Sequence, residues 1–85
     1  MTIDYSPRFK RLYKKLPFTI KEMAEIRERI FLKDPFDSRL KTHKLSGDMK
    51  NYWAFSIDHK YRIIFSFVSN RLVRFHAVGD HSIYN

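Results

Sequence analysis

The spacing of apolar residues near the N-terminus predicts a short helix. In "YSPRFKRLYKKLP", Ser6 can cap the free N–H groups of a first turn, and Pro7 suits the first helical position. The apolar residues that follow at helical spacing form one stripe: Phe9, Leu12, Tyr13 and Leu16. Pro17 marks the expected end of the helix. The basic residues of "KRLYKK" are then its solvated face.

A second, longer helix is predicted in "FTIKEMAEIRERIFLKDP". Thr19 and Glu22 have the spacing of a capping box at its start. Phe18 and Met23 sit at the positions of a hydrophobic staple. Asp34-Pro35 predicts its end. Its buried side is expected to consist of Ile20, Met23, Ile26 or Arg27, and Ile30.

From residue 49 onward the hydrophobic period changes to two, which is typical of strands with one buried face. The segments are "NYWAFSID", "YRIIFSFV" and "RLVRFHAV", and the connections "HK" and "SN" are short enough for hairpins. The opposite face is expected to bring Arg62, Arg74 and His76 next to one another. The face expected to cover the helices carries Trp53, Phe55, Ile57, Tyr61, Ile63, Phe65, Phe67, Val73, Phe75 and Ala77.

With a short strand in "TIDY", these elements predict an α+β fold in the order β-α-α-β-β-β. The sheet is expected to be small and mainly antiparallel, with about four strands and both N-terminal helices packed on one face. A chain of 85 residues is long enough for one modest core, so residues 1–85 are expected to form a single domain.

The chain is strongly basic: 17 Lys and Arg residues stand against 9 Asp and Glu residues, and the formal net charge is +8. A field of this sign favours a polyanionic partner, such as nucleic acid, a membrane surface or an acidic protein. A basic soluble protein without such a partner is the alternative.

Several kinds of site are not expected. The chain has no cysteine, which excludes disulfides and thiolate metal sites, and its four histidines lack the spacing of a zinc motif. No Gly-rich phosphate loop or other cofactor motif is present. The start "MTIDYSPRFK" has no apolar signal segment, and the apolar runs are too short to span a bilayer. We therefore expect a cytoplasmic protein without a metal, a small-molecule cofactor or a membrane anchor.

The segment "HAVGDHSIYN" directly continues the last predicted strand. Gly79 can bend the backbone where the strand ends. His81 and Tyr84 are therefore expected to fold over the basic face of the sheet.

The order of elements resembles that of the RelE/ParE superfamily of bacterial toxin–antitoxin toxins. The likeness is carried by "YSPRFKRLYKKLP", "LKTHKLSGDMKNYWAFSI", "YRIIFSF" and "VGDHSIY", which together cover nearly the whole chain. The set looks most like the mRNA-cleaving branches, RelE, YafQ and YoeB, and less like the gyrase-poisoning ParE branch. The resemblance implies an endoribonuclease that cuts mRNA in the ribosomal A site, and a cognate antitoxin that silences it.

The resemblance also implies roles for single residues. Arg62 matches the strand arginine beside the scissile phosphate, and His81 matches the C-terminal catalytic histidine of YafQ-like chains. Tyr84 lies where related chains keep a functional aromatic residue, and His43 matches the histidine that opens "HKLSG". Three positions depart from the pattern: Ser56 replaces a histidine, Lys60-Tyr61 replaces Asp-Trp, and Ala77 replaces an arginine.

These residue types suit RNA cleavage, because histidine exchanges protons near neutral pH and arginine binds phosphate through two charge-assisted hydrogen bonds. Each also has a simpler interpretation. His81 and His43 can be solvated surface histidines, Arg62 can pair with an acid such as Asp58, and Tyr84 can be a packing residue. His59 is expected to lie in solvent.

Five further residues are candidates for binding RNA or the ribosome: Lys41, Lys44, Lys50, Arg74 and His76. A solvated basic loop and an ordinary exposed strand face are the alternatives. Two other functions stay open for the chain as a whole. One is a non-enzymatic inhibitor of DNA gyrase of the ParE kind, and the other is a basic RNA-binding module without cleavage.

Overall fold

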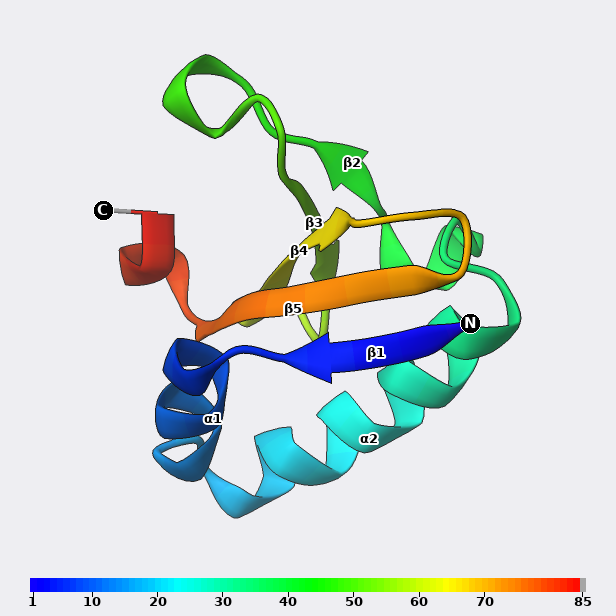
Figure 1. Ribbon diagram of the computed structural model, residues 1–85. Helices are drawn as coiled ribbons and strands as arrows, with labels where there is room; N and C mark the ends of the chain where they lie inside the picture. The colour runs from blue at the N-terminus through cyan, green and yellow to red at the C-terminus, as the bar shows by residue number, and fades with distance from the viewer. Residues whose placement is uncertain (85) are drawn as a thin grey trace.

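The computed structural model describes residues 1–84, which form one five-stranded sheet, two α-helices and three short 3₁₀ helices. The strands and α-helices are β1 (Thr2–Tyr5), α1 (Pro7–Lys14), α2 (Phe18–Lys33), β2 (His43–Lys44), β3 (Trp53–Ser56), β4 (Arg62–Phe67) and β5 (Leu72–Gly79). The 3₁₀ helices are η1 (Ser38–Leu40), η2 (Gly47–Met49) and η3 (His81–Tyr84). Both α-helices lie on one side of the sheet (Figure 1). The predicted α+β class, element order and helix placement are confirmed.

The sheet has the strand order β1-β5-β4-β3-β2. β1 runs parallel to β5, with Thr2 opposite Leu72, and the other three pairings are antiparallel. The expected sheet of about four strands lacked β2, because two residues are too few to show a period of two. This short strand pairs His43 with Ala54 at the edge of the sheet.

The start of α1 agrees with the prediction. The Ser6 side chain accepts a hydrogen bond from the N–H of Phe9 at 3.0 Å, and Pro7 occupies the first helical position. The Ser6 hydroxyl also donates to the carbonyl of His76 at 3.1 Å. The cap residue therefore joins α1 to β5 as well as starting the helix.

The predicted start of α2 is wrong. The helix begins directly after Pro17, which has no side-chain cap, and the Pro17 carbonyl accepts the first helical hydrogen bonds. Thr19 consequently lies inside the first turn and does not cap it. Phe18 is 74% exposed, so the staple with Met23 does not form either. The predicted end at Asp34 is confirmed.

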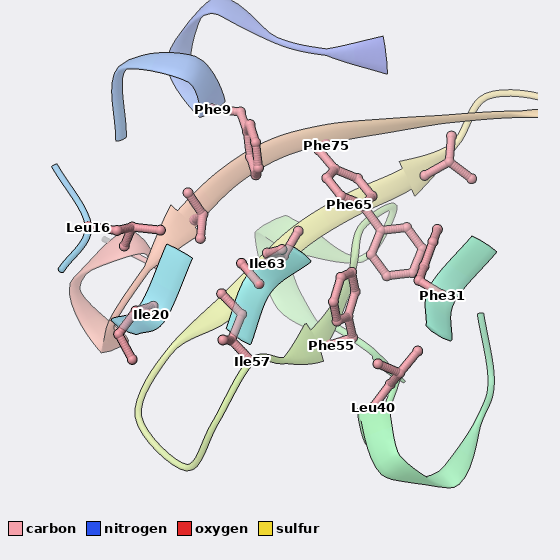
Figure 2. Close-up of a cluster of buried hydrophobic side chains, with 13 residues drawn as sticks. Phe9, Leu16, Ile20, Phe31, Leu40, Phe55, Ile57, Ile63, Phe65 and Phe75 are labelled. Atoms are coloured by element: carbon pink, nitrogen blue, oxygen red, sulfur yellow. The ribbon is translucent and has the colours of Figure 1, made fainter. Parts of the chain in front are cut away.

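The main core lies between the helices and the sheet and is largely aromatic (Figure 2). Phe31 of α2 is fully buried, and its ring centroid lies 5.0 Å from the centroids of both Phe55 and Phe65. Trp53 and Tyr61 are only partly buried, and the expectation that Phe67 covers the helices is wrong, since it is 39% exposed near the end of β4. The other predicted strand positions up to Phe75 are buried: Phe55, Ile57, Ile63, Phe65, Val73 and Phe75.

The buried side of α2 differs from the predicted stripe. Ile26 is half exposed, whereas the Nε of Arg27 donates to the carbonyl of Ile57 at 3.2 Å. Of the two alternatives at this turn, Arg27 therefore faces the fold. Met23 and Ile30 pack against the core only in part, and the buried residues of α2 are Ile20, Ala24 and Phe31.

A β-bulge changes which side of the sheet the end of β5 faces. The pairing of β4 with β5 slips by one residue between Ile64 and Phe65. Beyond the slip, Val78 joins the core under the helices, whereas Ala77 packs with Ile64 and Ile83 on the opposite face. The expectation that Ala77 covers the helices is wrong, because one inserted residue inverts the alternation.

The face predicted to be basic and half open carries a second, smaller core. Ile64, Ala77 and Ile83 are buried there. The residues that pack around them are partly buried and come from α1, the segment around η2 and η3: Leu12, Leu45, Met49, Tyr52 and Tyr84. Part of this face is therefore apolar and covered.

Replacing Phe31 by Ala is expected to lower the free energy of unfolding by about 3–5 kcal/mol, because it removes a buried ring and leaves a cavity. Phe18→Ala is the matched control, and its effect should stay within about 0.5 kcal/mol because the ring is exposed. Urea unfolding followed by Trp53 fluorescence measures both. Equal stabilities of the two variants would contradict this description of the core.

Candidate active site

A cleft of about 860 Å³ opens between the start of β4, η3 and the segment around β2. All four predicted catalytic residues line it, although they come from three separate elements: His43, Arg62, His81 and Tyr84. The other lining residues are Leu45, His59, Lys60, Asp80 and Ser82. The fold therefore brings the four residues together, and the chemical role of each stays a prediction.

Arg62 is held at the start of β4 by backbone groups. It pairs with Ser56 and Gly79 of the neighbouring strands, and its Nη1 donates to the carbonyl of Asp58 at 2.8 Å. Within residues 1–84, no carboxylate lies within ion-pair distance of its guanidinium, so the alternative of a salt bridge with Asp58 does not hold. A guanidinium anchored through one nitrogen can present its other N–H groups to a phosphate.

His43 is exposed on the edge strand β2, and its ring is oriented by the backbone. Its Nδ1 lies 3.0 Å from the carbonyl oxygen of Lys41. Because a carbonyl oxygen only accepts, Nδ1 carries the proton in this contact. In the neutral ring, Nε2 is then the nitrogen that can accept a proton.

η3 carries His81 and Tyr84 into the cleft, with their ring centroids 5.5 Å apart. The N–H and the hydroxyl of Ser82 both donate to Oδ1 of Asp80, at 3.0 and 2.7 Å. These hydrogen bonds hold the pKa of Asp80 below its ordinary value. Ile83 is buried in the second core and attaches η3 to the sheet. The prediction that this segment folds back is confirmed.

Tyr84 keeps its proton at neutral pH. Burial raises the pKa of its phenol, and the nearby charge of Arg62 offsets only part of that increase. A neutral phenol can donate a hydrogen bond to a phosphate oxygen in the cleft. Both roles foreseen for Tyr84, packing and phosphate orientation, are compatible with its half-buried position.

His59 and Lys60 line the cleft as well, and both are exposed, as expected for His59. The N–H groups of Lys60 and Tyr61 donate to Oδ1 of Asp58 at 2.9 and 2.7 Å, which closes the β3–β4 turn. Burial raises the pKa of Asp58, but these two hydrogen bonds, together with the charges of His59 and Arg62, outweigh it, and the net pKa is lowered. An Asp that starts a tight turn is a sequence signal for this geometry.

The predicted RNA-binding residues lie outside the cleft lining: Lys41, Lys44, Lys50, Arg74 and His76. The three lysines are exposed on the segment from residue 41 to residue 50, which includes β2 and η2. That segment also supplies His43 and Leu45 to the cleft. A role of the lysines in holding RNA beside the cleft therefore stays a prediction.

Arg74 and His76 do not lie next to Arg62, contrary to the prediction. Arg74 is opposite Ser66, four positions along β4 from Arg62, or roughly 13 Å at ~3.3 Å per residue. Its Nε is paired with the Asp4 carboxylate at 2.7 Å. The Nε2 of His76 lies 2.7 Å from the Ser66 hydroxyl.

The surroundings of His76 favour its neutral form. Its ring packs edge-on against Tyr52, with the centroids 4.9 Å apart. Burial, followed by the charge of Arg74, lowers the pKa of His76, and Asp4 opposes this shift. His76 is therefore a half-buried residue that packs against Tyr52, and these contacts favour the alternative of an ordinary strand position.

Within residues 1–84, no group of three or more His, Cys, Asp or Glu side chains is arranged to bind a metal ion. Neither α1 nor α2 is long and apolar enough to cross a membrane, and the same holds for every other helix in the described part of the chain.

Solved structures of bacterial toxins share this architecture. YafQ from E. coli strain BL21(DE3) superposes with a TM-score of 0.76 at 22% identity, over 98% of this chain and 96% of that one. The chain has the RelE/ParE toxin fold. A YoeB/ParE toxin from Agrobacterium tumefaciens gives a TM-score of 0.79 at 20% identity, over 95% of this chain and 99% of that one.

YafQ also matches in a structure described as the E. coli DinJ–YafQ toxin–antitoxin complex. The TM-score is 0.74 at 23% identity, over 96% of this chain and 93% of that one. No protein-family model and no curated protein sequence matches the chain. At these identities the likeness establishes the RelE/ParE fold alone, and it confirms the fold that the sequence motifs suggested.

Gly79→Ala is expected to displace η3, because an added Cβ would lie 2.5 Å from Cγ2 of the buried Ile83. Overpacking of this kind costs about 1–3 kcal/mol. NMR chemical shifts of His81 and Ile83 should change. Gly47→Ala is the control: its φ of +65° makes the substitution strained, but no atom lies within 4 Å of the new Cβ. Unchanged η3 shifts in Gly79→Ala would contradict the close contact.

Proposed function

We propose that the chain is the toxin of a type II toxin–antitoxin system and acts as a ribosome-dependent, metal-independent endoribonuclease that cuts mRNA and inhibits translation. The cleft carries the proposal, because an arginine, a lysine, a tyrosine and three histidines converge there on a toxin-like fold. The net charge of +8 adds a long-range attraction for RNA.

Cleavage without a metal needs a base for the 2′-hydroxyl, positive charge at the phosphate and an acid for the 5′-oxygen. The 2′-oxygen bonds to phosphorus while the bond from phosphorus to the 5′-oxygen breaks. The products are a 2′,3′-cyclic phosphate and a free 5′-hydroxyl. The proton removed from the 2′-hydroxyl and the proton given to the leaving oxygen are handled by separate groups.

In this proposal Arg62 stabilises the charge that develops on the phosphate. His81 and His43 divide the proton transfers, and the Nδ1 contact of His43 leaves its Nε2 ready to accept a proton. Tyr84 donates to a phosphate oxygen or stacks on a base. The ribosome supplies an aligned mRNA, so free RNA is cut slowly.

The three departures from the YafQ-like pattern differ in their consequences. Ser56 and Ala77 are buried, at 8% and 0% exposure, and neither lines the cleft. Lys60 lines the cleft and brings a positive charge to the position where an acid is expected. Catalysis in this chain therefore relies on more positive charge and fewer acidic groups than the family pattern does.

A cognate antitoxin is the proposed protein partner, and the ribosome with its mRNA is the proposed target in the cytoplasm. The antitoxin is supported by neighbours solved as complexes, DinJ–YafQ from E. coli and YoeB–YefM from Staphylococcus aureus. No small-molecule cofactor and no membrane enters this proposal. The description of the Agrobacterium neighbour as a YoeB/ParE toxin favours gyrase inhibition as the second candidate function.

Expression of the chain alone is expected to arrest bacterial growth by stopping protein synthesis, and co-expression of its antitoxin should restore growth. Pulse labelling of new protein, together with a test for DNA breaks, separates the candidate functions. Continued protein synthesis accompanied by DNA breaks would favour a gyrase inhibitor. Salt-sensitive RNA binding without growth arrest would favour a simple RNA-binding module.

His81→Ala is expected to slow mRNA cleavage on programmed ribosomes by roughly 10²–10⁴-fold, the scale of one general acid–base group. Arg62→Ala should cost roughly 10²–10³-fold through lost charge stabilisation. Arg71→Ala is the matched control, since this exposed arginine lies in the turn beyond the far end of β4. Circular dichroism checks that each variant folds. A folded His81→Ala protein that cuts at the wild-type rate would remove His81 from the mechanism.

A further inference from the structure

α1 and its C-terminal flanking residue carry a dense group of positive charges. Residues 7–17 include no carboxylate, and their cations are Arg8, Lys10, Arg11, Lys14 and Lys15. All five are exposed, and none forms an ion pair within residues 1–84. Like charges on one short helix repel each other. Such a concentration is unfavourable for the isolated fold and fits a surface that meets an anionic partner.

The buried side of α1 divides these cations into two groups. At about 100° per residue, Arg8, Arg11 and Lys15 project on the flank beside Leu12, and Lys10 and Lys14 on the flank beside Tyr13. Leu12 packs against the second core, which contains Ile83 of η3. Leu12 packs against the main core as well. The first group, named here the Arg8–Arg11–Lys15 ridge, therefore lies on the flank of α1 nearer to η3, and no residue of α1 lines the cleft itself.

The second group faces negative charge. Lys10 and Lys14 line a cavity of about 430 Å³ together with Glu25 and Glu28 of α2. These two lysines thus have carboxylates across the cavity from them. The ridge residues line neither cavity, and no ion pair joins them to a carboxylate within residues 1–84. The cleft carries one carboxylate, Asp80, against the two positive charges of Lys60 and Arg62, so the ridge adds to a net positive charge there.

We propose that the Arg8–Arg11–Lys15 ridge binds the phosphate backbone of RNA next to the RNA segment held in the cleft. Arg8 and Lys15 are about 10 Å apart along the helix axis at ~1.5 Å per residue, which spans roughly three phosphates of one strand of a duplex. Contacts of this type position a nucleic acid without reading its sequence. This inference rests on one part of the proposed function, namely that the cleft binds RNA.

The ridge suits RNA better than a membrane or a protein. The apolar side of α1 is buried in the fold, with Phe9 at 5% and Leu16 at 8% exposure, so α1 has no apolar face to insert into a bilayer. A stable protein interface needs an apolar centre, and the ridge consists of charged side chains. Phosphate oxygens match both the charge and the fork geometry of the two arginines.

The test compares two pairs of substitutions of equal charge, Arg8→Gln/Arg11→Gln on the ridge and Lys10→Gln/Lys14→Gln on the other flank. Each pair removes one cation from the last turn of α1, so the effects on the helix itself are matched. The probe is a fluorescein-labelled hairpin of 2′-O-methyl RNA, which the proposed reaction cannot cut. Fluorescence anisotropy measures binding over a range of KCl concentrations, with circular dichroism as the folding control.

The ridge pair is expected to weaken binding roughly tenfold near 0.1 M salt and to reduce the slope of log K against log salt by about 1.8, which corresponds to two lost phosphate contacts. The other pair should weaken binding by about threefold or less, because Glu25 and Glu28 already offset its charges. Equal losses from both pairs would overturn the proposal, since net charge alone would then explain the binding. The proposal would also be overturned if the ridge pair bound the RNA hairpin with unchanged affinity and lost affinity only for vesicles of anionic lipid.

The two proposals fail separately. If the wild-type protein does not cut mRNA on programmed ribosomes but the ridge pair weakens hairpin binding as described, the nuclease proposal fails and the ridge remains an RNA-binding surface. If the wild-type protein cuts mRNA and the two pairs bind the hairpin equally, the ridge proposal fails and the nuclease proposal remains.

Discussion

Ile83 is buried against Ile64 and Ala77 on the side of the sheet opposite the main core. Full burial of such a side chain contributes about 1.5–3 kcal/mol, which matters greatly for a four-residue 3₁₀ helix with poor hydrogen-bond geometry of its own. The hydrogen bonds of Asp80 shape η3 internally, but the apolar contact attaches it to the sheet. The position of His81 in the cleft that Arg62 also lines depends on this contact.

The β-bulge in the β4–β5 pairing makes this contact possible. By adding one residue to β5, it turns the small side chain of Ala77 toward Ile64 and leaves room for Ile83 above them. The same inversion turns Val78 under the helices, where it fills the main core. The bulge therefore contributes to both cores, because the alternation of side chains along β5 is inverted on its far side.

Much of the fold could be predicted from the hydrophobic pattern, and so could the four residues that meet in the cleft. The Ser6 cap and the aromatic strand positions have local signals, and the family motif supplied His81 and Arg62. The bulge has no local sequence signal, because the residues of β5 remain mostly apolar on both sides of it and the inverted alternation cannot be recognised. The contribution of Lys60 depends on a turn closed by Asp58, and the separation of Arg74 from Arg62 depends on strand register. The register is a property of strand pairing that a single strand does not carry, whereas the Asp that starts the turn is a local sequence signal for the position of Lys60.

The parallel pairing of β1 with β5 joins segments far apart in the chain, as Asp4 and Arg74 are 70 residues apart and form an ion pair. Contacts over such distances give a high contact order, so the closing of this pair is expected to be slow compared with the formation of α2. A chain emerging from a ribosome cannot complete the sheet until residues 72–79 are available. Because β5 also pairs with Arg62 and leads into η3, the cleft is absent from every shorter nascent chain, and any activity located there begins only after synthesis of that segment.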